Sequence, residues 1–260
     1  MTGPSLRGQV GYLAARSVVR TLRQPAYVVP PLLFPLCLLA VNSAGLSPST
    51  RLPGFPSSSF LPFALAVPFM QGALFATMNA GTDLARDIQT GFLNRLSLTP
   101  MRAPALIAGH LAGVTVMGFL QACVYLAVGL IAGSGLKAGP AGAVVLLFLA
   151  TFVAAGFGAL GAFMALRTGS GEAIQGLFPL LFVALFISSM NAPRHLMSVT
   201  WFRDAATANP VSYLLEGVRS LIIEGWNGQA LALAFAVATA ITALSVAASA
   251  AALRARLTRT

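Results

Sequence analysis

The sequence predicts an all-α membrane protein with six transmembrane helices, and three observations lead to this expectation. First, 57% of the 260 residues are hydrophobic and only 8% are charged, whereas soluble domains carry roughly 25% charged residues. Second, the charges avoid six long stretches, each close to the length that crosses a bilayer. Third, no block of mixed composition is long enough to form a separate soluble catalytic domain.

The six expected spans follow from length, because a hydrocarbon core of about 30 Å needs roughly 20 helical residues. They cover residues 27–46, 60–79, 105–132, 143–166, 172–190 and 230–253. The fifth is the shortest. Five prolines are expected to kink the first two spans: Pro30, Pro31, Pro35, Pro62 and Pro68. Glycine pairs in the later spans, such as Gly109 with Gly113, are expected to allow close helix approach.

The basic residues orient these spans. Eleven of the 16 lie in segments on one side and five on the other, and the side richer in arginine and lysine is normally cytoplasmic. Both termini are therefore expected in the cytoplasm. Because the basic residues flank apolar spans, the formal net charge of +10 indicates a lipid bilayer as partner and no nucleic acid.

Residues 1–25 are expected to form a cytoplasmic amphipathic lead-in. On a helical projection, an apolar stripe lies opposite the arginines. The helix should then lie flat on the inner leaflet with its apolar stripe in lipid; a solvated basic leader is the alternative. The stripe is Val10, Ala14, Val18 and Leu22, and the opposite face carries Arg16, Arg20 and Arg23.

The connection 81–103 between the second and third spans is the most ordered polar stretch. Leu84 and Ile88 repeat at helical spacing, and Asp83, Arg86 and Asp87 are expected on a wetter side. Gly91 is expected to end this turn in a left-handed conformation. A second short apolar face, of Phe92, Leu93 and Leu96, then precedes Pro100. Two amphipathic turns favour a docking element for a partner protein, although a helix lying on lipid fits the pattern as well.

The connection before the last span contains a second helix. Asn209 and Pro210 are typical of an N-cap followed by the first helical position. An apolar face follows, and Glu216 and Arg219 are spaced to pair on the opposite face before Gly225 ends the helix. The helix is too short to cross a bilayer, so we expect either a re-entrant hairpin with the sixth span or a surface helix packed on the bundle. The apolar face is Val211, Leu214, Leu215, Val218 and Ile222.

The sequence lacks the residues that several other classes of protein need for their function. The Gly-x-x-x-x-Gly-Lys-Ser/Thr phosphate loop is absent, and Lys137, the one lysine, has neither its spacing nor a following hydroxyl. Cys37 and Cys123 lie in apolar spans without ligand spacing, which predicts no metal site. An ion-driven carrier would need an ionisable relay, but the central turns of the six windows carry no charge. A membrane enzyme would need an assembled nucleophile or metal, and the two histidines, His110 and His195, fall on opposite sides.

The layout resembles the permease subunits of ABC-2 type transporters, especially multidrug and antibiotic exporters of the daunorubicin-resistance type. The resemblance covers essentially the whole chain as one domain, 1–260. It rests on the lead-in, the six spans, the connection with Gly91, Leu96 and Pro100, and the run from Asn209 to Arg219, which is the most diagnostic part. It implies a subunit of a bacterial inner (cell) membrane, without catalytic residues, metal or bound cofactor. ATP and Mg would bind to two copies of a separate ABC ATPase, and this chain would form a homodimer or, alternatively, a heterodimer.

The resemblance also assigns roles to three groups of residues. ATPase coupling falls to Asp87, Gly91, Phe92, Arg95, Leu96 and Pro100. The re-entrant helix is marked by Asn209, Pro210, Tyr213, Glu216 and Arg219. The substrate path is placed at Phe69, Gln71, Phe75, Phe178 and Phe182. Polar residues within spans, including Gln71 and Asn79, could equally hydrogen-bond to a neighbouring helix.

The expected cargo is a drug-like or lipid-like amphiphile exported from the cytoplasm or inner leaflet. An aromatic content of 9% with only 2 Trp and 4 Tyr favours an apolar path over a sugar-stacking channel. The alternatives are a polysaccharide or glycolipid exporter permease of the same family, and an ion-coupled secondary transporter.

Overall fold

A computed structural model describes residues 6–92 and 103–257, and within these ranges the chain is helical without strands. The all-α class is therefore confirmed. The helices are α1 (Leu6–Leu22), α2 (Pro25–Gly45), α3 (Phe60–Ala64), α4 (Ala66–Gln89), α6 (Ala103–Ile131), α7 (Gly139–Thr168), α8 (Gly171–Phe186), α9 (Thr200–Ala208), α10 (Pro210–Arg219) and α11 (Gly228–Leu257). Short 3-10 turns cover Ser47–Arg51 and Arg194–Leu196, and a π-helical turn covers Ser220–Glu224.

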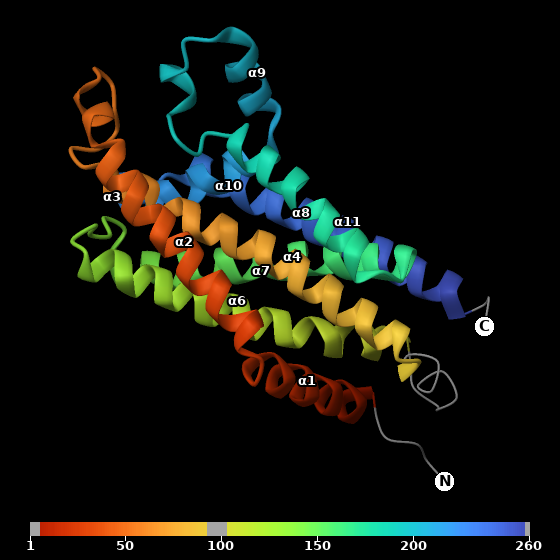
Figure 1. Cartoon of the computed structure of the whole chain (residues 1–260). Coiled ribbons are helices and arrows are strands. Elements are labelled where there is room, and N and C mark those ends of the chain that lie inside the picture. The colour runs from red at the N-terminus through yellow and green to blue at the C-terminus, as the bar shows by residue number, and fades with distance from the viewer. Residues whose placement is uncertain (1–5, 93–102, 258–260) are drawn as a thin grey trace.

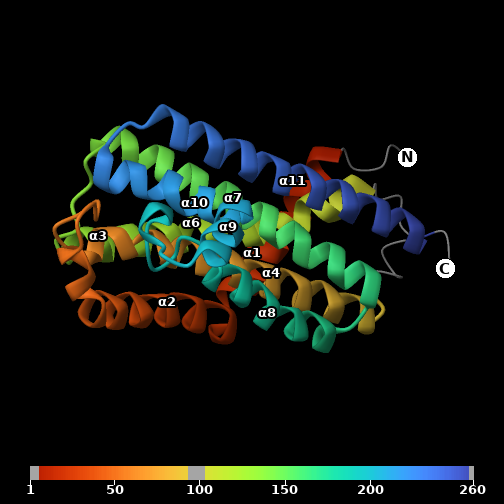
Figure 2. The same ribbon diagram turned by 90° about the horizontal axis from the view of Figure 1, so that it is seen from above.

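The long helices run side by side in one bundle, and both chain ends lie at the same end of it (Figures 1 and 2). We call this the terminal end. The opposite end carries α3, α9 and the turns that follow α2 and α6, and we call it the loop end. Within the described residues, five segments are long and apolar enough to span a membrane: Pro25–Gly45, Phe60–Gln89, Ala105–Ile131, Gly139–Thr168 and Gly228–Arg256. The remaining predicted span is α8, whose 16 residues measure about 24 Å at 1.5 Å per residue.

The centre of the bundle is α4, which α2, α6, α7 and α8 surround. Of its most apolar stretch, 89% is buried, against 17% for α2 and for α11. The contact with α7 is close because Gly81 and Gly161 leave no side chains between the backbones. Thr77 Oγ1 donates to the carbonyl of Phe157 at 3.0 Å and joins the two helices further. The α4–α7 pair is therefore the tightly packed core of the fold.

The second span is interrupted near its prolines, as expected, whereas α2 is one continuous helix. The helical assignment breaks at Leu65, between α3 and α4, where Pro68 cannot donate a hydrogen bond to Ala64. Three prolines lie inside α2: Pro30, Pro31 and Pro35.

The orientation predicted for the N-terminal helix is wrong. Instead of presenting its arginines away from the bundle, α1 turns Arg16 and Arg20 towards α4. Its backbone lies against α6, where Gly109 and Gly113 leave room for Leu13 and Ser17. These glycines allow close helix approach, as expected. The exposed apolar residues of α1 are Tyr12, Val19 and Leu22, so the face available to lipid is rotated from the predicted stripe.

The predicted wetter side of residues 83–87 is wrong for Asp83 and Asp87, whereas Arg86 is exposed as expected. These residues do not form a separate turn, because α4 continues from the second span to Gln89. Asp83 and Asp87 are only 9% and 8% exposed. They face the arginines of α1, which explains why two carboxylates can lie on the buried side of an otherwise apolar bundle.

Candidate functional site

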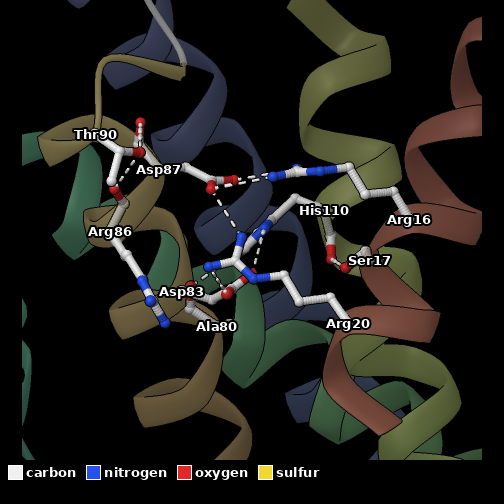
Figure 3. Close-up of polar contacts among 9 residues, drawn as sticks. All are labelled: Arg16, Ser17, Arg20, Ala80, Asp83, Arg86, Asp87, Thr90 and His110. Carbon is white, nitrogen blue, oxygen red and sulfur yellow. Dashed lines mark hydrogen bonds and ion pairs between the residues drawn. The ribbon is translucent and has the colours of Figure 1, made fainter. Parts of the chain in front are cut away.

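A cluster of charged side chains joins three helices at the terminal end of the bundle (Figure 3). Arg16 and Arg20 come from α1, Asp83 and Asp87 from the last turns of α4, and His110 from the second turn of α6. The spacing of four residues within each helical pair puts both arginines on one face of α1 and both aspartates on one face of α4. We refer to these five residues as the ionic cluster.

Arg20 is the centre of the ionic cluster. Its Nη2 lies 2.7 Å from Asp83 Oδ1, and its Nη1 donates to Asp87 Oδ1 at 2.8 Å. Arg16 is a more distant second partner of Asp87, with contacts of 3.3 and 3.4 Å. Burial alone would lower the pKa of Arg20, but the two carboxylates outweigh it and hold this pKa above its ordinary value. Arg20 therefore stays charged.

His110 connects the cluster to α6. Its Nε2 lies 2.9 Å from the carbonyl of Ala80, and because a carbonyl only accepts hydrogen bonds, Nε2 must carry the hydrogen. Its Nδ1 lies 4.0 Å from Asp83 Oδ2. The backbone carbonyl of His110 accepts a hydrogen bond from Ser17 Oγ of α1 at 3.2 Å. His110 thus contacts both other helices of the cluster.

The ionic cluster leads directly into the connection between α4 and α6. Gly91 follows α4 with φ of 69°, so the predicted left-handed terminator is confirmed. The guanidinium of Arg16 lies over the ring of Phe92, 4.0 Å from its centroid. Arg95, Leu96 and Pro100, the other predicted coupling residues, lie outside the described residues. Asp87, Gly91 and Phe92 are thus placed beside α1, but their coupling role stays a prediction.

At the loop end, the predicted start of α10 is confirmed. The Asn209 side chain accepts a hydrogen bond from the Val211 amide at 2.9 Å, with Pro210 at the first helical position. The Asn209 amide group also donates to the carbonyls of Ala184 and Ile187 at 2.6 and 3.0 Å, which attaches α10 to the end of α8. The apolar face of the helix is buried as predicted.

The predicted pair of Glu216 with Arg219 is wrong. Glu216 instead receives two hydrogen bonds from Arg194, at 2.7 and 2.5 Å. Burial alone would lower the pKa of Arg194, but hydrogen bonding and attraction to Glu216 raise it above its ordinary value. Arg194 also stacks on the ring of Tyr213. This three-residue contact attaches the turn before α9 to α10, and its Arg194 and Glu216 line a cleft of about 380 Å³.

Arg219 is buried, with 5% exposure, and binds main-chain carbonyls. Its guanidinium donates to Phe63 at 3.0 Å, to Ser189 at 2.5 Å and to Met190 at 2.6 Å, and it stacks on the Phe63 ring. One side chain thus joins α10 to α3 and to the turn after α8. The rigid, planar donor fork of arginine suits such a three-way contact.

The predicted path residues divide into two groups. Phe75, Phe178 and Phe182 contact one another, and Phe34 of α2 covers them with centroid distances of 6.1 and 5.9 Å to Phe75 and Phe182. Phe69 and Gln71 form the second group and are buried inside the bundle, as is Phe75 of the first. Phe69 packs edge-on against Tyr125. No structural observation tests whether substrate passes any of these residues.

The sequence reasoning missed the ionic cluster as a unit. It assigned Asp87 to ATPase coupling and placed Arg16 and Arg20 on the face of the lead-in opposite its apolar stripe, so it did not bring these residues together. The available signal was compositional: an arginine pair and an aspartate pair, each four residues apart, occur in a chain with only 6 acidic residues. Charges so scarce next to a membrane are expected to find one another.

Comparison with known proteins identifies the family. The family model described as ABC-2 type transporter matches residues 8–223, which is most of the chain. The daunorubicin resistance ABC transporter permease protein DrrB1 of Streptomyces coeruleorubidus is 28% identical over 201 residues. That alignment covers 75% of this chain and 66% of the relative, so the chain spans slightly less than two thirds of the relative's length. The family match, together with a bundle of apolar helices of spanning length, shows that this chain belongs to the ABC-2 type transporter family of membrane proteins.

Proposed function

We propose that this chain is the membrane-spanning permease subunit of an ATP-driven exporter whose ATPase lies on a separate chain. The observation that carries the proposal is the ionic cluster. It joins the helix before the connection 93–102 and the helix after it to one another and to α1. A displacement imposed on the connection from outside would reach all three helices together.

The proposed topology has six passes with both termini in the cytoplasm. The five long spans alone would put the chain ends on opposite sides of the membrane, whereas the ends lie together (Figure 1). Counting the short α8 as a further pass resolves this difference. In this arrangement the ionic cluster lies at the cytoplasmic surface, where an ATPase would dock, and the α10 helix lies at the outer surface as a re-entrant element.

The proposed cargo is a drug-like or lipid-like amphiphile, and the transporter is a dimer of this chain with two ATPase copies. The name of the relative refers to daunorubicin resistance, which supports a drug-like cargo. Phe34 of α2 and Phe186 of α8, 43% and 50% exposed, border the phenylalanine group formed by Phe75, Phe178 and Phe182. Such a surface suits a flat apolar molecule entering from lipid or contact with a second protomer.

Purification of the chain with its candidate ATPase tests this proposal. We expect a stable complex whose ATP turnover in proteoliposomes falls when Gly91, Arg95 or Leu96 is substituted. Arg23→Ala, at the exposed residue that follows α1, serves as the matched control and should leave turnover unchanged. The proposal fails if no complex forms, or if none of the three substitutions changes ATP turnover. A separate measurement, the accumulation of daunorubicin in inverted vesicles, tests the proposed cargo.

A further inference from the structure

Three prolines inside α2, among them Pro31 and Pro35, leave main-chain carbonyls without their helical partners. In an α-helix each carbonyl accepts a hydrogen bond from the amide four residues later, and proline has no amide hydrogen. Pro31 therefore cannot bond to the carbonyl of Tyr27, and Pro35 cannot bond to the carbonyl of Pro31. Within a bilayer, water is not available to replace these bonds.

Side chains from two other helices supply the missing donors. Asn79 of α4 donates through Nδ2 to the carbonyl of Tyr27 at 3.1 Å. Tyr125 of α6 donates through its hydroxyl to the carbonyl of Pro31. The Tyr125 ring is 1% exposed and packs edge-on against Phe69, which holds the hydroxyl in place. Two of the three carbonyls that the prolines free are thus bound, each by a different neighbouring helix.

These two bonds are important because α2 has little other attachment. Its buried residues are Pro31, Pro35 and Leu39, and Leu32 and Leu36 pack against the core while partly exposed. A proline-kinked helix is also easier to bend than a regular one. The hydrogen bonds from Asn79 and Tyr125 are therefore a large part of what fixes the position of α2 against α4 and α6.

We infer that Asn79 and Tyr125 are positioning residues, and that α2 is a hinged helix which these two side chains hold against the bundle. Asn79 lies one turn from Asp83, so it joins α2 to the same end of α4 that the ionic cluster holds. Phe34 of α2 covers Phe75 and Phe182, so release of α2 uncovers the phenylalanine group. The inference rests on the proposed function only where it assigns this release to the transport cycle.

The chain carries natural reporters for the test. Cys37 lies on α2, and Cys123 lies on α6 two residues from Tyr125; both are free. Nitroxide labels on these two cysteines report the separation of the helices by EPR. The full-length protein is placed in lipid nanodiscs and diluted with a cysteine-free copy, so that the measured distances lie within one chain.

The expected result is one narrow distance distribution for the unchanged sequence. In Tyr125→Phe and in Asn79→Ala a longer component grows, with about a threefold to fifteenfold change in the ratio of released to docked α2, the range given by single hydrogen bonds inside membranes. Tyr12→Phe removes a hydroxyl from a tyrosine that is 74% exposed and should change nothing.

A second variant separates positioning from general damage. Pro35→Ala restores the amide hydrogen that the carbonyl of Pro31 lacks, so Tyr125→Phe in that background should return to the narrow distribution. The inference is overturned if Tyr125→Phe leaves the distribution unchanged, or if Pro35→Ala does not suppress its effect. No ATPase takes part in this measurement. If the label distance shifts as expected but the chain forms no complex with its ATPase, the proposed function is refuted and the positioning role stands. If the complex forms but the label distance does not shift, the positioning role is refuted and the proposed function stands.

Discussion

Substitution of Arg20 by alanine should destabilise the attachment of α1 to the bundle. Arg20 has 18% of its side chain exposed, and its partners Asp83 and Asp87 have 13% and 12%. Removing one partner of a fully buried ion pair costs about 3–5 kcal/mol. Arg16 still lies 3.3 Å from Asp87 after the change, but Asp83 loses the one arginine that contacts it in the described part of the chain. We therefore expect a loss of about 2–3 kcal/mol.

The assay is the free energy of unfolding in mixed micelles, followed by circular dichroism during titration with a denaturing detergent. Arg23→Ala is the matched control, because Arg23 directly follows α1 and is exposed. Asp83→Ala and the double variant with Arg20→Ala complete a thermodynamic cycle. Because the carboxylate that loses Arg20 is absent from the double variant, its loss should be smaller than the sum of the single losses by about 1–2 kcal/mol.

Two results would refute this reasoning. If Arg20→Ala lies within about 0.5 kcal/mol of Arg23→Ala, which is the usual range for surface substitutions, the ionic cluster does not stabilise the fold. If the two single losses add in the double variant, Arg20 and Asp83 do not interact, and the attachment of α1 depends on its contact with α6 instead.

Three further predictions concern other parts of the bundle. Arg219→Met removes the side chain that donates to three buried carbonyls, so it should lower the free energy of unfolding by about 3 kcal/mol. Arg219→Lys should recover only part of this loss, because lysine lacks the planar set of donors of the guanidinium group. Gly161→Ala places a methyl group against the backbone of α4 and should cost about 1–3 kcal/mol, whereas Gly176→Ala, which has open space around it, should be neutral in the same titration. Gly91→Ala meets no neighbouring atom but forces φ of 69° on a residue with a side chain, so a strain of about 1–2 kcal/mol should speed hydrogen–deuterium exchange in the last turn of α4.

Much of the fold could be predicted from the sequence because the bilayer allows few solutions. A long apolar stretch without charge must be helical so that its backbone amides and carbonyls are hydrogen-bonded within lipid. The number of stretches of sufficient length then gives the number of crossings. The same reasoning worked for the start of α10, where Asn209 and Pro210 act through local geometry alone. It was less informative for α8, whose apolar stretch runs to Met190 although the helix ends at Phe186. That end depends on tertiary contacts of Asn209 and Arg219, which sequence spacing does not reveal.

The direction in which charged faces point could not be predicted in the same way. Amphipathic patterns were interpreted with charges outward, as on a soluble helix, and this placed Arg16, Arg20 and Asp83 on wet surfaces. In a bundle surrounded by lipid, a charged face is more stable against an opposite charge than against hydrocarbon. Only the three-dimensional arrangement shows that α1 and the end of α4 supply charges of opposite sign.

The distribution of contacts also indicates which parts of the bundle can move. The α4–α7 pair is joined by glycine contacts and by Thr77, and any separation there would expose backbone to lipid at high cost. By contrast, α2 depends on two hydrogen bonds from Asn79 and Tyr125 and has few buried side chains. A displacement of the connection 93–102 would therefore move α4, α6 and α1 together through the ionic cluster, and α2 is the neighbour least able to resist. A transport cycle in this molecule would accordingly change the position of α2 relative to an otherwise preserved core.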